Sequence, residues 1–162
     1  METKFENTLE FEDQTEKCSG LEEMFTKLLD HICEEQKLEN VLESLTIVDD
    51  ETIHKLNLQY RKTDRPTDVL SFSFEEGEDE TGLPFTNLGE VVISLDTARR
   101  QAAEFKHPVC RELAFLFIHG TLHNLGYDHA RSHEDAVIMF ALQNKILNSF
   151  EFPWEACQWP KD

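Results

Sequence analysis

Residues 109–129 read VCRELAFLFIHGTLHNLGYDH, and this stretch is the most informative about the fold, because it predicts a buried helix that the rest of the chain must cover. Its first half is apolar around most of the circumference of a helix, which is typical of a helix buried among other elements rather than lying on a surface. The dipeptide His107-Pro108 interrupts the helical pattern just before it. We therefore predict a central helix over residues 109–125, around which the other elements pack.

The second half of the stretch carries three histidines. His119 and His123 are four residues apart, so on a helix they project from the same face, one turn apart. Gly126 favours the left-handed backbone that ends a helix, which lets His129 return toward the same point. Three imidazoles without a nearby fourth ligand are typical of catalytic zinc sites, although imidazole also suits copper, nickel and iron. We predict a metal site of His119, His123 and His129, with one zinc ion expected.

A protease is the first alternative for such a site. The spacing His-x3-His-x2-Gly-x2-His equals that of the metzincin proteases, but Gly120 stands where they carry their catalytic glutamate. Peptide hydrolysis would then need a replacement for the base that deprotonates the metal-bound water. A metzincin-like metallohydrolase is therefore the less favoured interpretation.

The flanking sequence alternates between strand and helix patterns. Ser19 is the expected N-cap of the first helix, and Asp49-Asp50 can cap the second. Helices are predicted over about residues 20–32, 50–60, 96–105 and 132–150, and strands over about 45–48, 68–74 and 89–94. The last two strands suggest a hairpin joined by the acidic turn 75–80, and an edge strand is weakly indicated by the alternation of Phe5, Leu9 and Phe11.

Composition favours one domain spanning residues 1–162, because the chain is short, 40% hydrophobic and 30% charged. A formal net charge of −18 argues against a generic basic surface for nucleic acid. The acid is concentrated in residues 1–50, with 15 acidic and 4 basic residues, and the acidic leader 1–19 is of uncertain order. The region around the histidines is closer to balance, so a metal ion and a single arginine can make one groove locally positive.

The compartment is expected to be the cytoplasm. Cys18, Cys33, Cys110 and Cys157 are far apart and form no C-x-x-C pair, which suggests four reduced thiols. The first residues, METKFE, do not resemble a secretory signal or a transit peptide. The longest apolar runs are shorter than the roughly 20 residues of a membrane span. We expect no membrane association and a monomer.

The chain resembles the YbeY-type single-strand-specific endoribonucleases of bacterial ribosomal RNA maturation. The likeness runs from about Leu45 to Leu147 and rests on three blocks of sequence. These are the histidine motif 119–129, the segment 56–72 with Leu56-Asn57, Tyr60-Arg61 and Pro66-Thr67-Asp68-Val69-Leu70-Ser71-Phe72, and the segment Leu88-Gly89-Glu90-Val91-Val92-Ile93-Ser94. Glu90 and Asn124 depart from the family pattern, which more often has Asp and an apolar residue there.

The resemblance implies an α+β fold, with a small mixed sheet of about four strands packed against about five helices and a zincin-like three-histidine site opening into a groove. It also implies a zinc-dependent endoribonuclease that acts on single-stranded RNA, in small-subunit rRNA 3′-end processing and in ribosome quality control, with the small ribosomal subunit and its factors as partners. Arg61 matches the functional arginine of the family. Its planar guanidinium can hold phosphate oxygens bidentately, which makes it the expected catalytic residue.

Other interpretations stay open at this stage. A non-catalytic ribosome-associated factor with structural zinc is the second alternative to the nuclease. Lys62 and Arg65 either guide RNA or belong to a solvated loop, and Asp128 either orients an imidazole or caps the turn. Trp154 and Trp159 are expected to cover the core near the end of the chain rather than to stack on bases.

Overall fold

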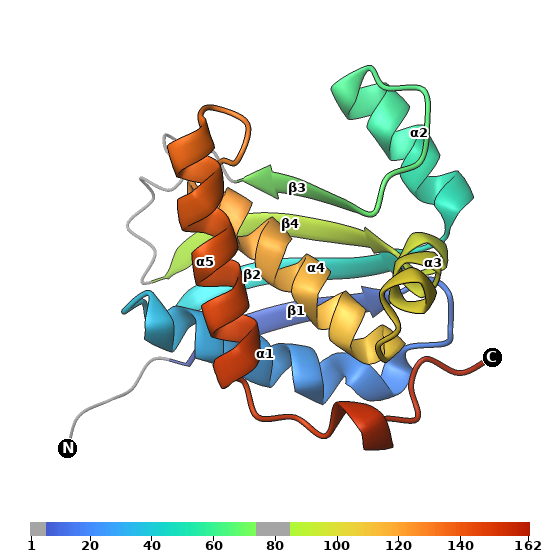
Figure 1. Cartoon of the computed structure of the whole chain (residues 1–162), viewed down its shortest axis with the longest axis horizontal. Helices are drawn as coiled ribbons and strands as arrows, with labels where there is room; N and C mark the ends of the chain where they lie inside the picture. Colours follow the sequence, from blue (N-terminus) through green and yellow to red (C-terminus); the bar gives the residue numbers. More distant parts are fainter. Residues whose placement is uncertain (1–5, 74–84) are drawn as a thin grey trace.

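The computed structural model describes residues 6–73 and 85–162. In chain order its main elements are β1 (Thr8–Asp13), α1 (Glu22–Glu35), β2 (Val41–Val48), α2 (Asp50–Arg61), β3 (Val69–Ser73), β4 (Thr86–Ser94), α3 (Leu95–Phe105), α4 (Val109–Asn124) and α5 (His133–Ser149). Short 3-10 turns lie at Ser19–Leu21 and Trp154–Ala156. Within the described residues, four strands and five α-helices confirm the predicted α+β fold (Figure 1).

The four strands form one mixed sheet in the order β1-β2-β4-β3. β1 and β4 both run parallel to β2, whereas β3 pairs antiparallel with β4, where Val69 lies opposite Ile93. The predicted edge strand is confirmed as β1, and the predicted antiparallel pair is confirmed as β3 and β4. The acidic turn 75–80, like Phe5, lies outside the described residues.

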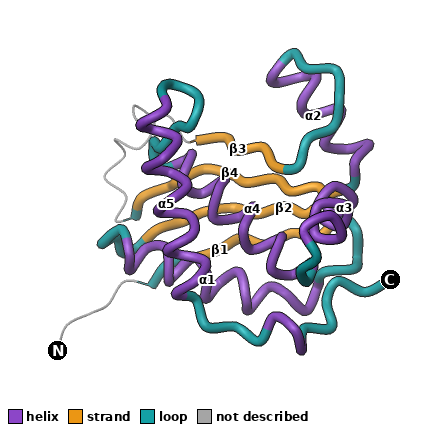
Figure 2. The backbone as a smooth tube through the Cα atoms, in the orientation of Figure 1, coloured by secondary structure: helices purple, strands orange, loops and turns teal. Residues whose placement is uncertain are grey.

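Helices α1, α4 and α5 lie together on one face of the sheet, where α4 packs on β3 and β4 and α1 packs on β1 (Figures 1 and 2). The ring of Phe117 on α4 meets the edge of Phe25 on α1, with 5.4 Å between centroids. Val91 of β4 faces this main core, while Val92 faces a smaller cluster that includes Ile53 of α2. The central position predicted for residues 109–125 is therefore confirmed.

Helix starts follow the local capping groups, with one correction. Asp49 accepts from the Thr52 amide at 2.8 Å and Ser132 accepts from the Asp135 amide at 3.1 Å. The prediction that Ser19 caps α1 is wrong, because Ser19 lies in a 3-10 turn and α1 begins after Leu21 without a side-chain cap. Asp13 sets this entry instead, since its Oδ2 accepts from the Cys18 amide at 2.6 Å.

The cysteines and the last residues of the chain belong to the packed structure. Cys18, Cys33 and Cys110 are buried, Cys157 is half-buried, and all four are free. Burial raises the pKa of each of the three buried thiols to about 12. As predicted, Trp154 and Trp159 pack against the main core. Among the described helices, none has the length and apolar character needed to cross a membrane.

Candidate metal centre

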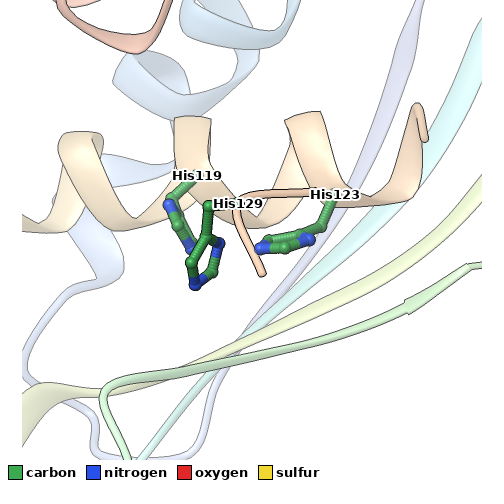
Figure 3. A group of neighbouring side chains, drawn as sticks. All are labelled: His119, His123 and His129. Atoms are coloured by element: carbon green, nitrogen blue, oxygen red, sulfur yellow. The ribbon is translucent and has the colours of Figure 1, made fainter. Parts of the chain in front are cut away.

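Three imidazoles converge at the C-terminal end of α4. His119 and His123 project from the helix, and His129 reaches back toward them from the segment that follows (Figure 3). The ring centroids are 4.7 to 5.2 Å apart, and one potential ligand atom of each side chain lies within 4.8 Å of the other two. The three residues predicted from spacing are thus brought to one point.

The return of His129 depends on the turn after α4. Gly126 has a φ of +104°, a left-handed conformation that favours glycine. Its amide donates to the His123 carbonyl at 3.0 Å, and the Tyr127 amide donates to the Leu122 carbonyl at 3.0 Å. This pair of bonds is the Schellman arrangement, which reverses the chain at the end of a helix. The predicted role of Gly126 as the helix terminator is confirmed.

Asp128 belongs to this turn. Its Oδ1 accepts from the Ala130 amide at 2.8 Å, and its Oδ2 lies 3.7 Å from Nε of Arg131. Of the two roles considered for Asp128, these contacts correspond to capping the turn. The carboxylate therefore fixes the course of the chain on either side of His129.

The donor set suits a divalent transition metal. Burial lowers the pKa of His119 against an opposing hydrogen bond with Gln143, and burial followed by the charges of the other two histidines lowers the pKa of His123. Both rings are therefore neutral near pH 7, the state in which imidazole binds a metal. Three imidazole nitrogens at one point, two from partly buried residues and one from the exposed His129, fit a three-histidine zinc site that keeps a fourth position open.

Gln143 of α5 orients the first ligand. Its Oε1 lies 3.0 Å from Nδ1 of His119, and an amide oxygen only accepts, so Nδ1 carries the proton and Nε2 is left with its lone pair. Gln143 is fully buried, and its Nε2 has no hydrogen-bond partner among the described residues. Among the described residues, the side chain of Gln143 therefore makes its hydrogen bond to His119 alone, through Oε1.

Gly120 lies where α4 comes close to the sheet. A Cβ added there would lie 2.7 Å from Cγ1 and 3.1 Å from Cγ2 of Val91 on β4. Any larger side chain at this position, including a glutamate, would have to displace the strand or the helix. The missing glutamate of the metzincin pattern therefore has a structural reason in this chain, which weighs further against the protease interpretation.

Arg61 stands at the end of α2, beside the histidines. Its guanidinium donates to the carbonyl of Ser71 and lies over the ring of Phe72, 5.1 Å from the centroid. The side chain is exposed, and it lines the same cavity of about 560 Å³ as His119, His123 and His129. The residue predicted to contact phosphate is therefore held next to the three histidines, with guanidinium N–H groups that no described residue accepts.

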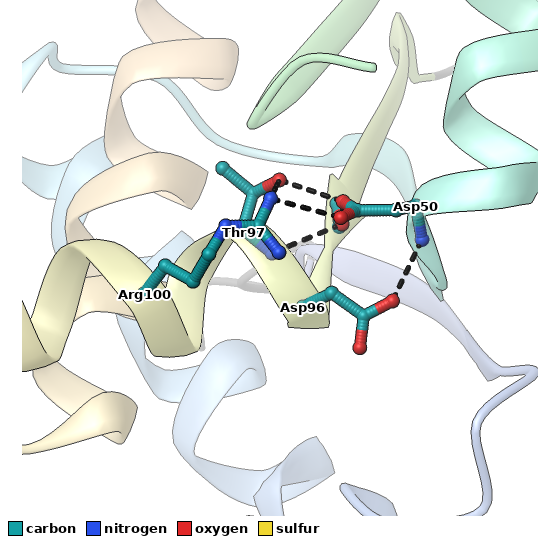
Figure 4. Close-up of polar contacts among 5 residues, drawn as sticks. Asp50, Asp96, Thr97 and Arg100 are labelled. Carbon is teal, nitrogen blue, oxygen red and sulfur yellow. Dashed lines mark hydrogen bonds and ion pairs between the residues drawn. The ribbon is translucent and has the colours of Figure 1, made fainter.

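Helix α2 begins at Asp50 and ends at Arg61, and the Asp50 side chain binds the N-terminal end of this helix to residues 94–100. Its carboxylate accepts from Ser94 Oγ at 2.6 Å, Thr97 Oγ1 at 2.7 Å and Arg100 at 2.8 Å (Figure 4). The Asp50 amide donates to Asp96 at 2.9 Å. Burial opposes ionisation of Asp50, but these hydrogen bonds outweigh it and lower its pKa. The network ties α2 to the start of α3.

Behind α4, a buried carboxylate joins the helix to the sheet. Glu43 of β2 is fully buried and accepts from Thr121 Oγ1 at 2.8 Å and from Asn124 Nδ2 at 3.3 Å. Asn124 also donates to the Glu90 carbonyl at 3.2 Å. Burial raises the pKa of Glu43 to about 7, although both hydrogen bonds oppose the rise. Asn124, a departure from the family pattern, thus connects the helix that carries the ligands to two strands.

The other basic residues take little part in the cavity. Lys62 and Arg65 are exposed and do not line it, whereas Arg100 binds Asp50 and Arg99 donates to the Lys161 carbonyl at 2.7 Å. Among the described residues that line the cavity, Arg61 is the one permanent cation. The positive charge that faces a ligand there therefore comes from Arg61 and from any bound metal.

Three contributors to this region were not predicted from the sequence: Gln143, Glu43 and Phe140, which also lines the cavity. Gln143 interrupts the buried stripe Met139, Ile146 and Leu147 on α5, which is a signal for a buried polar group. Glu43 was missed because the strand was predicted to begin at residue 45. Extending the strand to Val41 places residues 41, 43, 45 and 47 on the same buried face, which would have indicated a buried glutamate.

Comparisons with known proteins agree with this geometry. A family model described as "Endoribonuclease YbeY" matches residues 8–151. A Lysinibacillus sphaericus protein named Endoribonuclease YbeY is 43% identical over 150 residues, covering 88% of this chain and 95% of that protein. An Oenococcus oeni protein of the same name is 48% identical over 117 residues, covering 71% and 76%. A Thermotoga maritima protein solved in solution superposes with a TM-score of 0.63 at 28% identity, covering 96% of this chain and all of that one.

Proposed function

The chain belongs to the YbeY endoribonuclease family, and from this membership we propose that it is a zinc-dependent, single-strand-specific endoribonuclease of rRNA maturation. The family name supports RNA as the substrate class and phosphodiester hydrolysis as the reaction. The proposal adds zinc as the metal, the 3′ end of small-subunit rRNA as the substrate, and a role in ribosome quality control. The observation that carries it is the convergence of His119, His123 and His129 beside Arg61 in one cavity.

His119, His123 and His129 would hold the zinc ion, which supplies a Lewis acid beside the scissile phosphate. Gln143 keeps the proton of His119 on Nδ1, so that the other ring nitrogen would be free to bind the ion. Arg61 donates to the phosphate oxygens and stabilises the negative charge that grows on them during cleavage. Phe72 and the Ser71 carbonyl hold the guanidinium in place for this task.

The acidity of the chain sets how substrate reaches the site. Cavity-lining residues within the described part of the chain include one arginine, and the whole sequence carries a net charge of −18. Such a surface gives weak nonspecific affinity for RNA, because few phosphates are neutralised on binding. We propose that the small ribosomal subunit and its factors deliver the strand in the cytoplasm to a monomeric enzyme that acts as one domain.

Cleavage of a defined substrate tests the proposal. Zinc-loaded protein is incubated with a labelled single-stranded RNA and with the same RNA in a duplex, and metal content is measured by elemental analysis. We expect cleavage of the single strand, loss of cleavage on chelation, and recovery on adding zinc back. Arg61→Ala should lower kcat at least about 100-fold while keeping the metal. Arg99→Ala, which removes an arginine engaged at the C-terminal tail, should behave like the wild type.

The same experiment separates the alternatives. A factor with structural zinc would bind the metal and lose stability with His123→Ala, but it would not cleave RNA. Cleavage that persists in both Arg61→Ala and the chelated protein indicates a contaminating nuclease and contradicts the proposal. Equal metal content in wild type and His123→Ala would overturn the ligand assignment.

A further inference from the structure

An exposed aromatic ring stands in the metal cavity with no role in the site described so far. Phe140 of α5 is 49% exposed and lines the cavity together with the three histidines and Arg61. Its ring centroid is 6.5 Å from that of His129. An aromatic side chain that lines a concave site beside a few polar groups is typical of the residues that contact a ligand there.

Packing of α5 does not account for Phe140. The core-facing side chains of this helix are those of Met139, Gln143, Ile146 and Leu147, which are buried. Ile138 is 55% exposed but lines a separate hollow of about 500 Å³, on the side of Leu125 and Tyr127. The same helix therefore offers three similarly exposed apolar residues, Val137, Ile138 and Phe140, and of these it is Phe140 that lines the metal cavity.

The aromatic residues on the other side of the site are already engaged. Phe72 carries the Arg61 guanidinium on its face and meets the edge of Tyr60 at 5.3 Å between centroids. Phe115, which also lines the cavity, packs against the main core. Phe140 is thus the cavity-lining aromatic, within the described residues, that combines large exposure with a position beside a metal ligand.

We propose that Phe140 is a stacking subsite for an unpaired nucleobase of the RNA, next to the phosphate held by Arg61 and the metal. This inference rests on the proposed function and names the group that reads the strand. Every base offers a π-face to an aromatic ring, so the subsite recognises single-stranded RNA without selecting its sequence. A base within a duplex is stacked on its neighbours and cannot reach the ring, so Phe140 would contribute directly to the preference for single strands.

The proximity of the ring to the ligands sets which base it takes. Since Phe140 lies 6.5 Å from His129 between ring centroids, the base belongs to a nucleotide at or adjacent to the cleaved bond. Removing that base should cost the same binding that removing the ring costs. Stacking on an aromatic side chain corresponds to about 5- to 100-fold in affinity for each base.

The test pairs variants of Phe140 with substrates that lack single bases. Zinc-loaded wild type, Phe140→Ala, Phe140→Leu and Phe140→Trp are assayed on a single-stranded RNA and on a series in which one nucleotide at a time is abasic. We expect Phe140→Ala and Phe140→Leu to raise KM about 5- to 100-fold with less effect on kcat, and Phe140→Trp to restore binding. One abasic position should raise KM for wild type but not for Phe140→Ala. Ile138→Ala is the matched control and should leave KM unchanged.

A binding measurement keeps this inference separate from the proposed activity. The same RNA, carrying the fluorescent base 2-aminopurine at one position at a time, should at one of these positions change its emission on binding wild type but not on binding Phe140→Ala. If wild type cleaves RNA while Phe140→Leu matches it in KM and emission, the subsite is wrong and the nuclease assignment stands. If wild type changes the emission without cleaving, the activity is wrong and the subsite stands, whereas failure of both contradicts both.

A second copy of the chain is the competing occupant of this face. If Phe140 lies in a homodimer interface, light scattering will show a dimer that dissociates on Phe140→Ala, and abasic substitution will have the same effect on wild type and variant. That result would overturn the subsite. The melting temperature of each variant should match that of wild type, because an exposed side chain contributes little to stability.

Discussion

The substitution Gly120→Ala tests whether the close approach of α4 to the sheet holds the metal ligands in place. The added Cβ would lie 2.7 Å from Cγ1 of Val91, about 1 Å shorter than an ordinary carbon contact. Val91 is fully buried and stiff at χ1, so it cannot turn away. Overpacking of this kind costs about 1–3 kcal/mol, and the helix preference of alanine over glycine returns about 0.5–1 kcal/mol. We expect a net loss of about 1–2 kcal/mol.

Thermal unfolding of the metal-free protein measures this loss directly. For a chain of this size, 1–2 kcal/mol corresponds to a fall of about 2–8 °C in Tm. Because the helix must shift to relieve the contact and carries His119 with it, we also expect weaker zinc binding in competition with a chelating dye. The double variant Gly120→Ala/Val91→Ala removes the contact. Its loss of unfolding free energy should therefore be about 1–3 kcal/mol smaller than the sum of the losses in the two single variants.

A second glycine provides the control for this rescue. A Cβ at Gly126 would meet no atom within 4 Å, so Gly126→Ala suffers from its backbone φ of +104° alone. Val91→Ala should therefore leave the cost of Gly126→Ala unchanged. If Gly120→Ala is as stable as wild type, or if Val91→Ala gives no rescue, the close contact between α4 and β4 does not limit this position and the reasoning is refuted.

Three further changes probe other parts of the site. Gln143→Leu should weaken zinc binding about 10- to 100-fold in chelator competition, because Nδ1 of His119 loses its acceptor, and unchanged affinity would contradict the orienting role. Burial raises the pKa of Glu43 from 4.5 to about 7, so the folded protein keeps this proton where the unfolded chain loses it, and stability falls as pH rises between these values. In urea unfolding, Glu43→Gln should therefore gain about 2 kcal/mol relative to wild type between pH 5 and pH 8. Parallel pH profiles of the two proteins would refute the assignment. Asp50→Ala should lower the unfolding free energy by about 1–3 kcal/mol. It should also lower kcat, because Asp50 holds the helix that carries Arg61, while zinc content stays at the wild-type level. Loss of zinc would show instead that α2 also supports the histidines.

The convergence of the three histidines was predictable from the sequence because their arrangement is local. His119 and His123 share a helical face by spacing alone, and Gly126 marks the point where the chain reverses toward His129. The buried character of α4 was equally readable, since its residues are apolar on nearly all sides. Local rules sufficed for these histidines because His119 and His123 lie one turn apart and His129 follows directly on the turn at Gly126.

Supporting contacts between distant segments were not predictable in this way. Gln143 is 24 residues from His119, and Glu43 is 78 residues from Thr121, so neither pairing has a signal in helical or strand period. The position of Arg61 beside the cavity came from a family resemblance, because an exposed arginine at a helix end has no distinctive pattern of its own. The prediction that Ser19 caps the first helix was wrong because the carboxylate of Asp13, five residues before Cys18, binds the Cys18 amide and shapes the turn that precedes the helix.

The buried cysteines bear on how the chain sorts its possible metal ligands. A thiolate, not a thiol, competes for zinc, and burial raises the pKa of Cys18, Cys33 and Cys110 to about 12, so these thiols stay protonated at pH 7. In the unfolded chain the same thiols titrate near their ordinary pKa and are accessible to the ion. Folding therefore buries the softer sulfur donors of Cys18, Cys33 and Cys110, while the imidazoles of the metal site stay accessible to the ion. Zinc supplied too early would be trapped on sulfur in unfolded protein, so refolding before adding zinc should give more correctly loaded enzyme than refolding in its presence.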